Sequence, residues 1–81
     1  MEKKEILSKL QEIFRDVMDN EDIILEGSTT AEDIEEWDSL SHVQVVDAAE
    51  KKFGVKFTSY EITSWIDVEE LVDCIAKKLN G

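Results

Sequence analysis

The sequence predicts an all-α fold: a small bundle of three longer helices and one short third helix, with a long loop between the first two. Three observations support this class. Apolar residues recur at helical spacing in three separate segments, proline is absent from the chain, and no hairpin signal appears. With 81 residues the chain fits one domain, which we place at residues 1–81.

The first helix follows from an apolar stripe near the N-terminus. Its members recur every three or four residues: Ile6, Leu7, Leu10, Ile13, Phe14, Val17 and Met18. We expect a helix of about 15 residues that ends at Asp19 and Asn20. Residues 20–37 then form a long connection. We expect the apolar patch at residues 23–25 to pin it to the core, and residues 30–34 to form one helical turn.

The second helix is predicted from Ser39 to Phe53. Asp38 is a favourable N-cap because its carboxylate can accept hydrogen bonds from the free amides of the first turn. Gly54 is the preferred residue just past a helix end. Residues 55–57 should be a short extended piece.

Two further helices complete the prediction. Thr58 or Ser59 can cap a brief third helix that runs through Ile62. Asp67, followed three residues later by Glu70, resembles a capping box for the last helix. The apolar stripe of that helix is Val68, Leu71, Val72, Ile75 and Leu79.

The second helix carries two stripes of different composition. The natural core side holds His42, Val45, Val46, Ala49 and Phe53. The side expected to face water holds Leu40, Val43, Asp47 and Glu50. Exposed apolar residues beside acids are typical of a docking surface, whereas the alternative is a core stripe that is merely wide.

Acidic charge is concentrated in the middle of the chain. The net charge is −11, and all nine Lys and Arg lie outside residues 16–50, which contain twelve acids. Such a surface repels nucleic acid and anionic lipid and attracts proteins with basic patches, although it could serve solubility alone. No apolar run reaches the ~20 residues of a membrane span, and the charged N-terminal segment lacks a signal sequence. We therefore expect a cytoplasmic protein.

The chemistry-bearing residues do not predict an enzyme or a metal site. Cys74 is the only cysteine and His42 the only histidine, so neither a disulfide nor a zinc site can form within the chain. Asp38, Ser39 and His42 fall within one helical turn, where they cannot form a serine–histidine–carboxylate relay. Trp37 and His42 instead have hydrophobic-staple spacing, so we expect their rings to pack together. Ser39 takes the first helical position with its hydroxyl outward, where a phosphate would meet the positive end of the helix dipole.

These features together resemble the acyl carrier protein family. The tripeptide Asp38-Ser39-Leu40 opens an acidic second helix after a long loop, and Gly54 closes that helix. The resemblance covers nearly the whole chain, because size, helix order and charge also match.

The resemblance implies that Ser39 accepts 4′-phosphopantetheine from coenzyme A through a separate Mg²⁺-dependent phosphopantetheinyl transferase, which makes the protein a phosphoprotein without catalytic residues or metal ligands. The arm would hold acyl or aminoacyl groups as thioesters and deliver them to acyl-transferring or acyl-activating enzymes. The protein, as a monomer, would bind basic patches on these partner enzymes through Asp38, Leu40, Val43, Asp47 and Glu50. The alternative is an unmodified acidic helical adaptor that binds a basic protein surface.

The residues around the tripeptide indicate which carriers within the family this chain resembles. Fatty-acid carriers usually read Gly-x-Asp-Ser-Leu, whereas Glu36 and Trp37 precede Asp38 here, and Asp47 stands where that group commonly has an apolar residue. The form Trp-Asp-Ser-Leu-x-His is similar to stand-alone carriers of specialised pathways, including polyketide, peptide or surface-polysaccharide assembly. Fatty acid biosynthesis is the less favoured pathway on this comparison.

Overall fold

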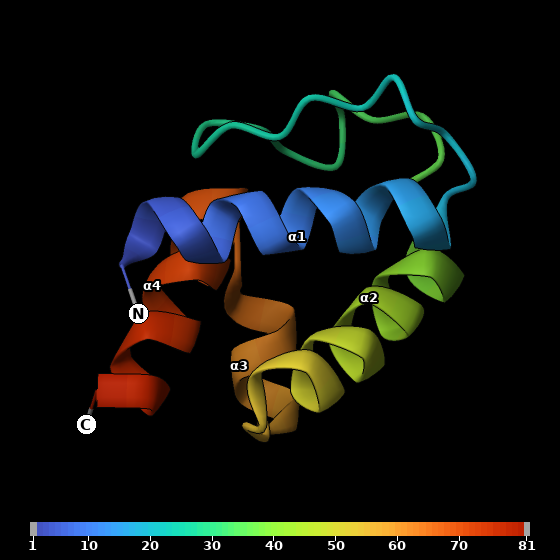
Figure 1. The fold of residues 1–81 in the computed structure, drawn as a ribbon. Helices are drawn as coiled ribbons and strands as arrows, with labels where there is room; N and C mark the ends of the chain where they lie inside the picture. The colour runs from blue at the N-terminus through green and yellow to red at the C-terminus, as the bar shows by residue number, and fades with distance from the viewer. Residues whose placement is uncertain (1, 81) are drawn as a thin grey trace.

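A computed structural model describes residues 2–80, and Figure 1 shows its four helices. They are α1 (Lys3–Val17), α2 (Ser39–Phe53), α3 (Ser59–Ser64) and α4 (Val68–Asn80). No strand occurs within residues 2–80, so the predicted all-α class with one short third helix is confirmed. None of these helices is both long and apolar enough to cross a membrane.

The predicted helix boundaries hold closely, with two differences. Helix α1 ends at Val17 with Met18 as its C-cap, and Asp19 after the cap adopts a left-handed backbone with φ of 50°. Helix α3 continues two residues past the expected end, to Ser64, whose hydroxyl donates to the carbonyl of Glu61 at 2.8 Å. Helix α2 has the predicted bounds because strong local caps lie at both ends: Asp38 before it and Gly54, with φ of 68°, after it.

The core forms where α1 packs on α2 and α4 (Figure 1). Its most deeply buried side chains come from these three helices: Ile6, Leu10, Phe14, Val45, Ala49, Val68, Leu71 and Ile75. Full burial of a side chain such as Leu or Phe contributes roughly 1.5–3 kcal/mol relative to exposure, so these contacts dominate the stability of the fold. Helix α3 contributes no buried side chain.

The loop between α1 and α2 is anchored to the helices, as predicted. Ile23 and Leu25 are buried in the core, whereas Ile24 between them is exposed. Two side chains of α1 also hold the loop backbone: the Arg15 Nε–H donates to the Ile23 carbonyl at 2.8 Å, and the Leu25 N–H donates to Gln11 Oε1 at 2.9 Å. Residues 30–34 form a single hydrogen-bonded turn rather than the expected helical turn.

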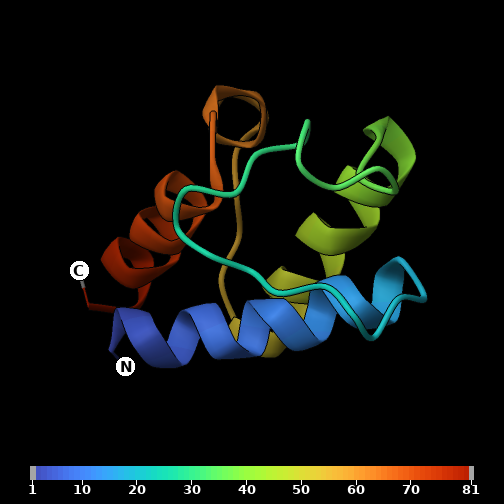
Figure 2. The ribbon, with the colours of Figure 1, turned by 90° about the horizontal axis from the view of Figure 1, so that it is seen from above.

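The same loop also completes the start of α4. Figure 2 shows it crossing above the space between α4 and α2 before it joins α2. The N–H groups of Val68 and Glu69 donate to the loop carbonyls of Thr29 and Gly27, at 2.9 and 2.8 Å. Because the first amides of a helix have no partner within the helix, these contacts stabilise α4 and fix the loop together.

The expected capping box of α4 is present in a shifted form. The Asp67 carboxylate accepts the Glu70 N–H at 3.1 Å, as predicted. The Glu70 carboxylate, however, accepts from the N–H of Ile66 at 2.6 Å and not from that of Asp67. The reciprocal contact is therefore displaced by one residue.

Candidate functional site at the N-terminus of α2

Ser39 is the first residue of α2 and is exposed. Its position is set by a capping box around it: Asp38 Oδ1 accepts the Ser41 N–H at 2.9 Å, and Ser41 Oγ accepts the Asp38 N–H at 2.8 Å. The predicted cap is thus confirmed. Because the backbone on both sides of Ser39 is held, its hydroxyl is presented from a rigid helix start.

Ser41 is a site residue that sequence reasoning missed. Its side chain is buried, and besides accepting from Asp38 its hydroxyl donates to the Glu36 carbonyl at 2.8 Å. The usual capping-box pattern has Glu or Gln three residues after the cap, so serine at that position is not predicted to complete a capping box. The signal that could have found it is the pairing Asp-x-x-Ser at a helix start.

The charge next to Ser39 is fixed by the same contacts. The hydrogen bond from the backbone of Ser41 holds the pKa of the Asp38 carboxyl below its ordinary value. Asp38 is therefore ionised at neutral pH and already occupies part of the positive end of the helix dipole. A phosphate on Ser39 would share that end with it.

Trp37 and His42 contact one another as their spacing predicted, but through a hydrogen bond as well as through their rings. The indole Nε1–H donates to His42 Nδ1 at 3.0 Å, with ring centroids 5.9 Å apart. Because Nδ1 accepts, we assign the imidazole proton to Nε2, which lies 3.1 Å from the Ile62 carbonyl and donates to it. Both ring nitrogens are therefore engaged away from Ser39. His42 is half-buried rather than a full member of the core stripe.

Five rings form a continuous row, which we call the aromatic row: Phe14, Trp37, His42, Trp65 and Phe57. Three of the four contacts are edge-to-face, with centroids 4.9 Å apart for Phe14 and Trp37, 5.9 Å for His42 and Trp65, and 5.1 Å for Trp65 and Phe57. Such pairs contribute about 0.5–1.5 kcal/mol each beyond the area that they bury. The row links α1, the start of α2 and both segments that flank α3.

A groove of about 600 Å³ opens beside Ser39, between the start of α2 and α3. We call it the Ser39 groove. Its lining includes Trp37, Ser39, His42, Val43, Ile62, Trp65 and Ile66. It is a surface hollow that is largely apolar, with Ser39 at its edge.

The outer face of α2 presents the expected apolar residues to solvent. Leu40 and Val43 are 69% and 62% exposed, which excludes the alternative of a merely wide core stripe. Asp47 is exposed too, although its carboxylate lies 3.1 Å from Lys51 Nζ one turn along the helix.

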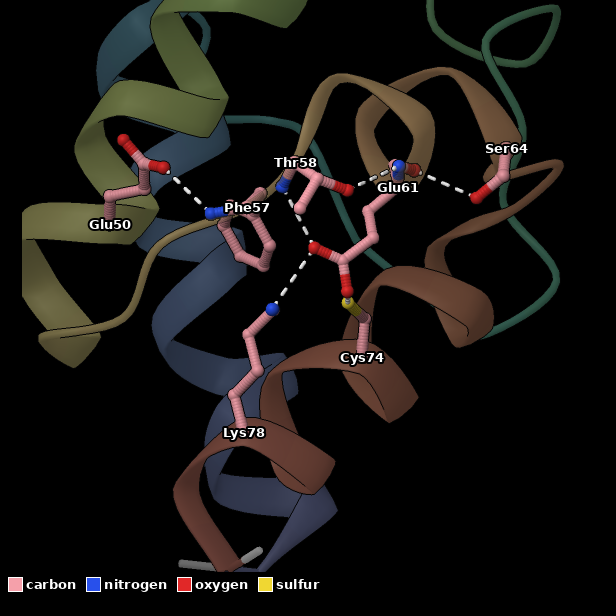
Figure 3. Close-up of polar contacts among 7 residues, drawn as sticks. All are labelled: Glu50, Phe57, Thr58, Glu61, Ser64, Cys74 and Lys78. Atoms are coloured by element: carbon pink, nitrogen blue, oxygen red, sulfur yellow. Dashed lines mark hydrogen bonds and ion pairs between the residues drawn. The ribbon is translucent and has the colours of Figure 1, made fainter.

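The expectation that Glu50 faces water is wrong. Its side chain is half-buried, and its carboxylate accepts the N–H of Phe57 at 2.9 Å (Figure 3). The left-handed backbone of Gly54 turns the chain back along α2, which brings the amide of Phe57 beside Glu50.

A second polar cluster holds the start of α3 (Figure 3). Thr58 is the N-cap: its Oγ1 accepts the Glu61 N–H at 3.2 Å, and Glu61 Oε1 accepts the Thr58 N–H at 2.8 Å. Lys78 Nζ from α4 lies 3.0 Å from the same carboxylate oxygen. The hydrogen bond from Thr58, followed by that from Lys78, lowers the pKa of Glu61 to about 2.

Cys74 lies against this cluster. Its thiol donates to Glu61 Oε2 at 3.6 Å and is partly buried. Burial raises the pKa of the Cys74 thiol, with the Glu61 charge adding to the effect. The group is therefore a protonated thiol at neutral pH and a poor nucleophile.

The fold and this site define a class: a small helical protein that presents an exposed serine at the capped start of its second helix. Comparisons with known proteins point to the same class. Residues 8–75 match the family described as the phosphopantetheine attachment site. An acyl carrier protein from Acidothermus cellulolyticus is 42% identical over 78 residues, which cover 94% of this chain and 90% of that protein.

A solved structure agrees with the sequence matches. The solution structure of the holo acyl carrier protein from Geobacter metallireducens has a TM-score of 0.85 and 39% identity to this chain. The match covers 91% of this chain and 85% of that one. The chain belongs to the acyl carrier protein family, whose covalent cofactor is 4′-phosphopantetheine. It is a carrier rather than a catalyst, and the adaptor alternative is not favoured.

Proposed function

We propose that Ser39 is the residue to which 4′-phosphopantetheine is attached, and that the loaded protein carries acyl or aminoacyl groups between enzymes. The observation that supports this most directly is the exposure of Ser39 at the first position of α2, within the tripeptide Asp38-Ser39-Leu40. The residues present fit the group, since the serine is accessible and borders an open groove. When attached, the cofactor supplies a thiol on which acyl groups are held as thioesters.

The attachment reaction requires a separate enzyme. Ser39 Oγ forms a bond to the phosphorus nearer the pantetheine of coenzyme A, the pyrophosphate P–O bond breaks, and adenosine 3′,5′-bisphosphate leaves. The serine proton must pass to a base. His42 does not provide that base, because Nδ1 accepts from Trp37 and Nε2 donates to Ile62. The transferase therefore supplies both the base and the Mg²⁺.

The experiment is an intact-mass measurement after incubation with coenzyme A, Mg²⁺ and a broad-specificity phosphopantetheinyl transferase. We expect a gain of one phosphopantetheine on the wild-type chain and no gain on Ser39→Ala. Ser28→Ala, which changes an exposed loop serine, is the matched control and should be modified like the wild type. A mass gain that survives Ser39→Ala would overturn the assignment.

Partner docking is the second part of the proposal. Leu40 and Val43 provide exposed apolar contacts beside Ser39, and Asp38 provides an ionised carboxylate. Asp47 is paired with Lys51 and Glu50 with the amide of Phe57, so a basic partner must compete for these two acids. We infer that the transferase and acyl-transferring or acyl-activating enzymes bind this face, and that the carrier acts as a cytoplasmic monomer.

Docking can be measured as the rate of association with the transferase. Contacts between acids of α2 and basic residues should make the rate fall clearly from low to physiological ionic strength. Asp47→Asn should reduce that salt dependence, and Leu40→Ala should weaken binding equally at both salt concentrations. A rate independent of salt would assign docking to the apolar pair Leu40 and Val43 instead.

A further inference from the structure

We propose that a chain carried on the arm of Ser39 lies on the surface, in the Ser39 groove, and that Trp37, His42 and Trp65 keep it out of the interior. This inference rests on the proposed attachment at Ser39. It predicts how the protein holds its cargo: acyl and aminoacyl groups lie against the apolar groove on the surface and are not stored inside the bundle.

The closure follows from where the three rings lie. Each of them lines the Ser39 groove. On its other side Trp37 contacts Phe14, which is fully buried, at a centroid distance of 4.9 Å. His42 sits between the two indoles, 5.9 Å from each, so the rings form a continuous floor between the groove and the core.

Hydrogen bonds hold this floor in place. The Trp37 indole donates to one nitrogen of His42, and the other nitrogen donates to the carbonyl of Ile62 on α3. An alkyl chain passing between α2 and α3 would have to separate these partners and could not replace either bond. The indole N–H, imidazole and carbonyl would then be left unpaired beside hydrocarbon, which is unfavourable for each group.

The groove, by contrast, is already open and apolar at its rim. Ile66 is 75% exposed and Val43 is 62% exposed, and both line the groove together with Ile62 of α3. The arm is the occupant that the geometry favours, because its attachment atom belongs to a residue of the groove lining. A tethered group reaches an adjacent surface at high effective concentration, so weak apolar contacts suffice to hold it there.

The test compares the holo form with an octanoyl form, made by supplying the transferase with octanoyl-coenzyme A and confirmed by intact mass. In the ¹⁵N-labelled protein we expect shifts in the amides of Val43, Ile62 and Ile66, and none in those of the buried residues Val45 and Leu71. Hydroxylamine should cleave the thioester within about two-fold of its rate on octanoyl-coenzyme A, because an exposed bond needs no opening step.

Three results would overturn the proposal. The first is cleavage slowed about ten-fold or more, which is the protection expected of a chain enclosed in the core. The second is a set of shifts at Val45 and Leu71. The third is the absence of shifts anywhere along the groove. Failure to gain the octanoyl-phosphopantetheine mass would instead overturn the attachment at Ser39, so the two failures are distinguishable.

A variant tests the role of the rings directly. Trp65→Ala removes one part of the floor, and the octanoyl chain should then enter the interior, slowing hydroxylamine cleavage several-fold relative to the wild type. Tyr60→Ala is the matched control, because Tyr60 is 82% exposed on α3 and should leave cleavage unchanged. Rapid cleavage in a folded Trp65→Ala variant would show that the rings are not what excludes the chain. The wild-type measurement decides the location of the chain even if this variant does not fold.

Discussion

The middle and the start of α3 are attached to the rest of the molecule by different forces. Its middle is tied to α2 by a neutral contact, the hydrogen bond that His42 donates to the Ile62 carbonyl. Its start is held by charge: Glu61 pairs with Lys78, and Glu50 accepts the amide just before the helix. Neutral contacts between partly buried groups are insensitive to salt, whereas salt weakens an ion pair, and does so only in part where the two side chains are partly buried, as in Glu61 and Lys78.

This difference matters because α3 cannot depend on the core. It has six residues, none of which is buried, and a helix of this length is unstable alone in water. Helix α2, which forms the other wall of the Ser39 groove, has a buried face. One wall of the groove is therefore fixed by packing, and the other is held by a few polar contacts that can be changed one at a time.

The largest effect should come from Trp37→Ala. The change removes the contact with Phe14 and the hydrogen bond to His42 at once. We expect a loss of about 2–3 kcal/mol in the free energy of unfolding, slightly below the range for a fully buried aromatic residue. Urea unfolding measures it. A loss below about 0.5 kcal/mol, the range of an ordinary surface substitution, would contradict a structural role for this ring.

His42 allows the two neutral hydrogen bonds to be separated. In His42→Asn the amide oxygen can accept from Trp37, and in His42→Gln the amide nitrogen can donate to Ile62, so each variant keeps one bond. Both variants lose the ring contacts of His42 with Trp37 and Trp65. Each should lose in addition about 1 kcal/mol of unfolding free energy, the usual net contribution of one hydrogen bond. Only His42→Asn should also raise hydrogen exchange in α3. Equal exchange in both variants would show that the bond to Ile62 does not hold the helix.

The ion pair between Glu61 and Lys78 is tested by Lys78→Met, with Lys77→Met as the matched control. Lys78 contacts Glu61 and lies 5.6 Å from the ring centroid of Phe57, whereas Lys77, the residue before it in α4, is exposed. Hydrogen exchange at the Ile62 amide should rise several-fold for Lys78→Met, because opening of α3 becomes easier. It should stay unchanged for the control. High salt should produce part of this rise in the wild type and none of it in Lys78→Met.

The smallest expected effect is the pH dependence of the stabilisation that Glu61 provides. The pKa of Glu61 is lowered from 4.5 to about 2, so the unfolded chain binds this proton first as pH falls. The ionised Glu61 stabilises the folded state fully above pH 4.5, and this stabilisation is lost as the pH falls toward about 2. Asp38 acts in the same direction. Melting temperatures of wild type and Glu61→Gln should therefore converge below pH 4.5, and curves that stay parallel would contradict the assigned contact.

The local parts of this protein could be predicted from sequence. Asp38 and Gly54 mark both ends of α2, and the tripeptide Asp38-Ser39-Leu40 predicts the attachment site that we propose. Thr58 and Ser59 were both predicted as possible caps of α3, and Thr58 is the one that caps it. These signals were sufficient because caps and apolar periodicity act within one or two turns, where the identities of nearby residues determine which contacts can form.

The long-range partners were decided only by the tertiary structure. No sequence pattern indicates that Glu50 accepts the amide of Phe57, or that His42 donates to Ile62 twenty residues away. Nor does any pattern indicate that the carbonyls of Gly27 and Thr29 accept the first N–H groups of α4. Each of these contacts depends on the path of a loop and on how the helices pack. Both are determined by the burial of all the apolar side chains of the core together, and not by residues that are neighbours in the sequence.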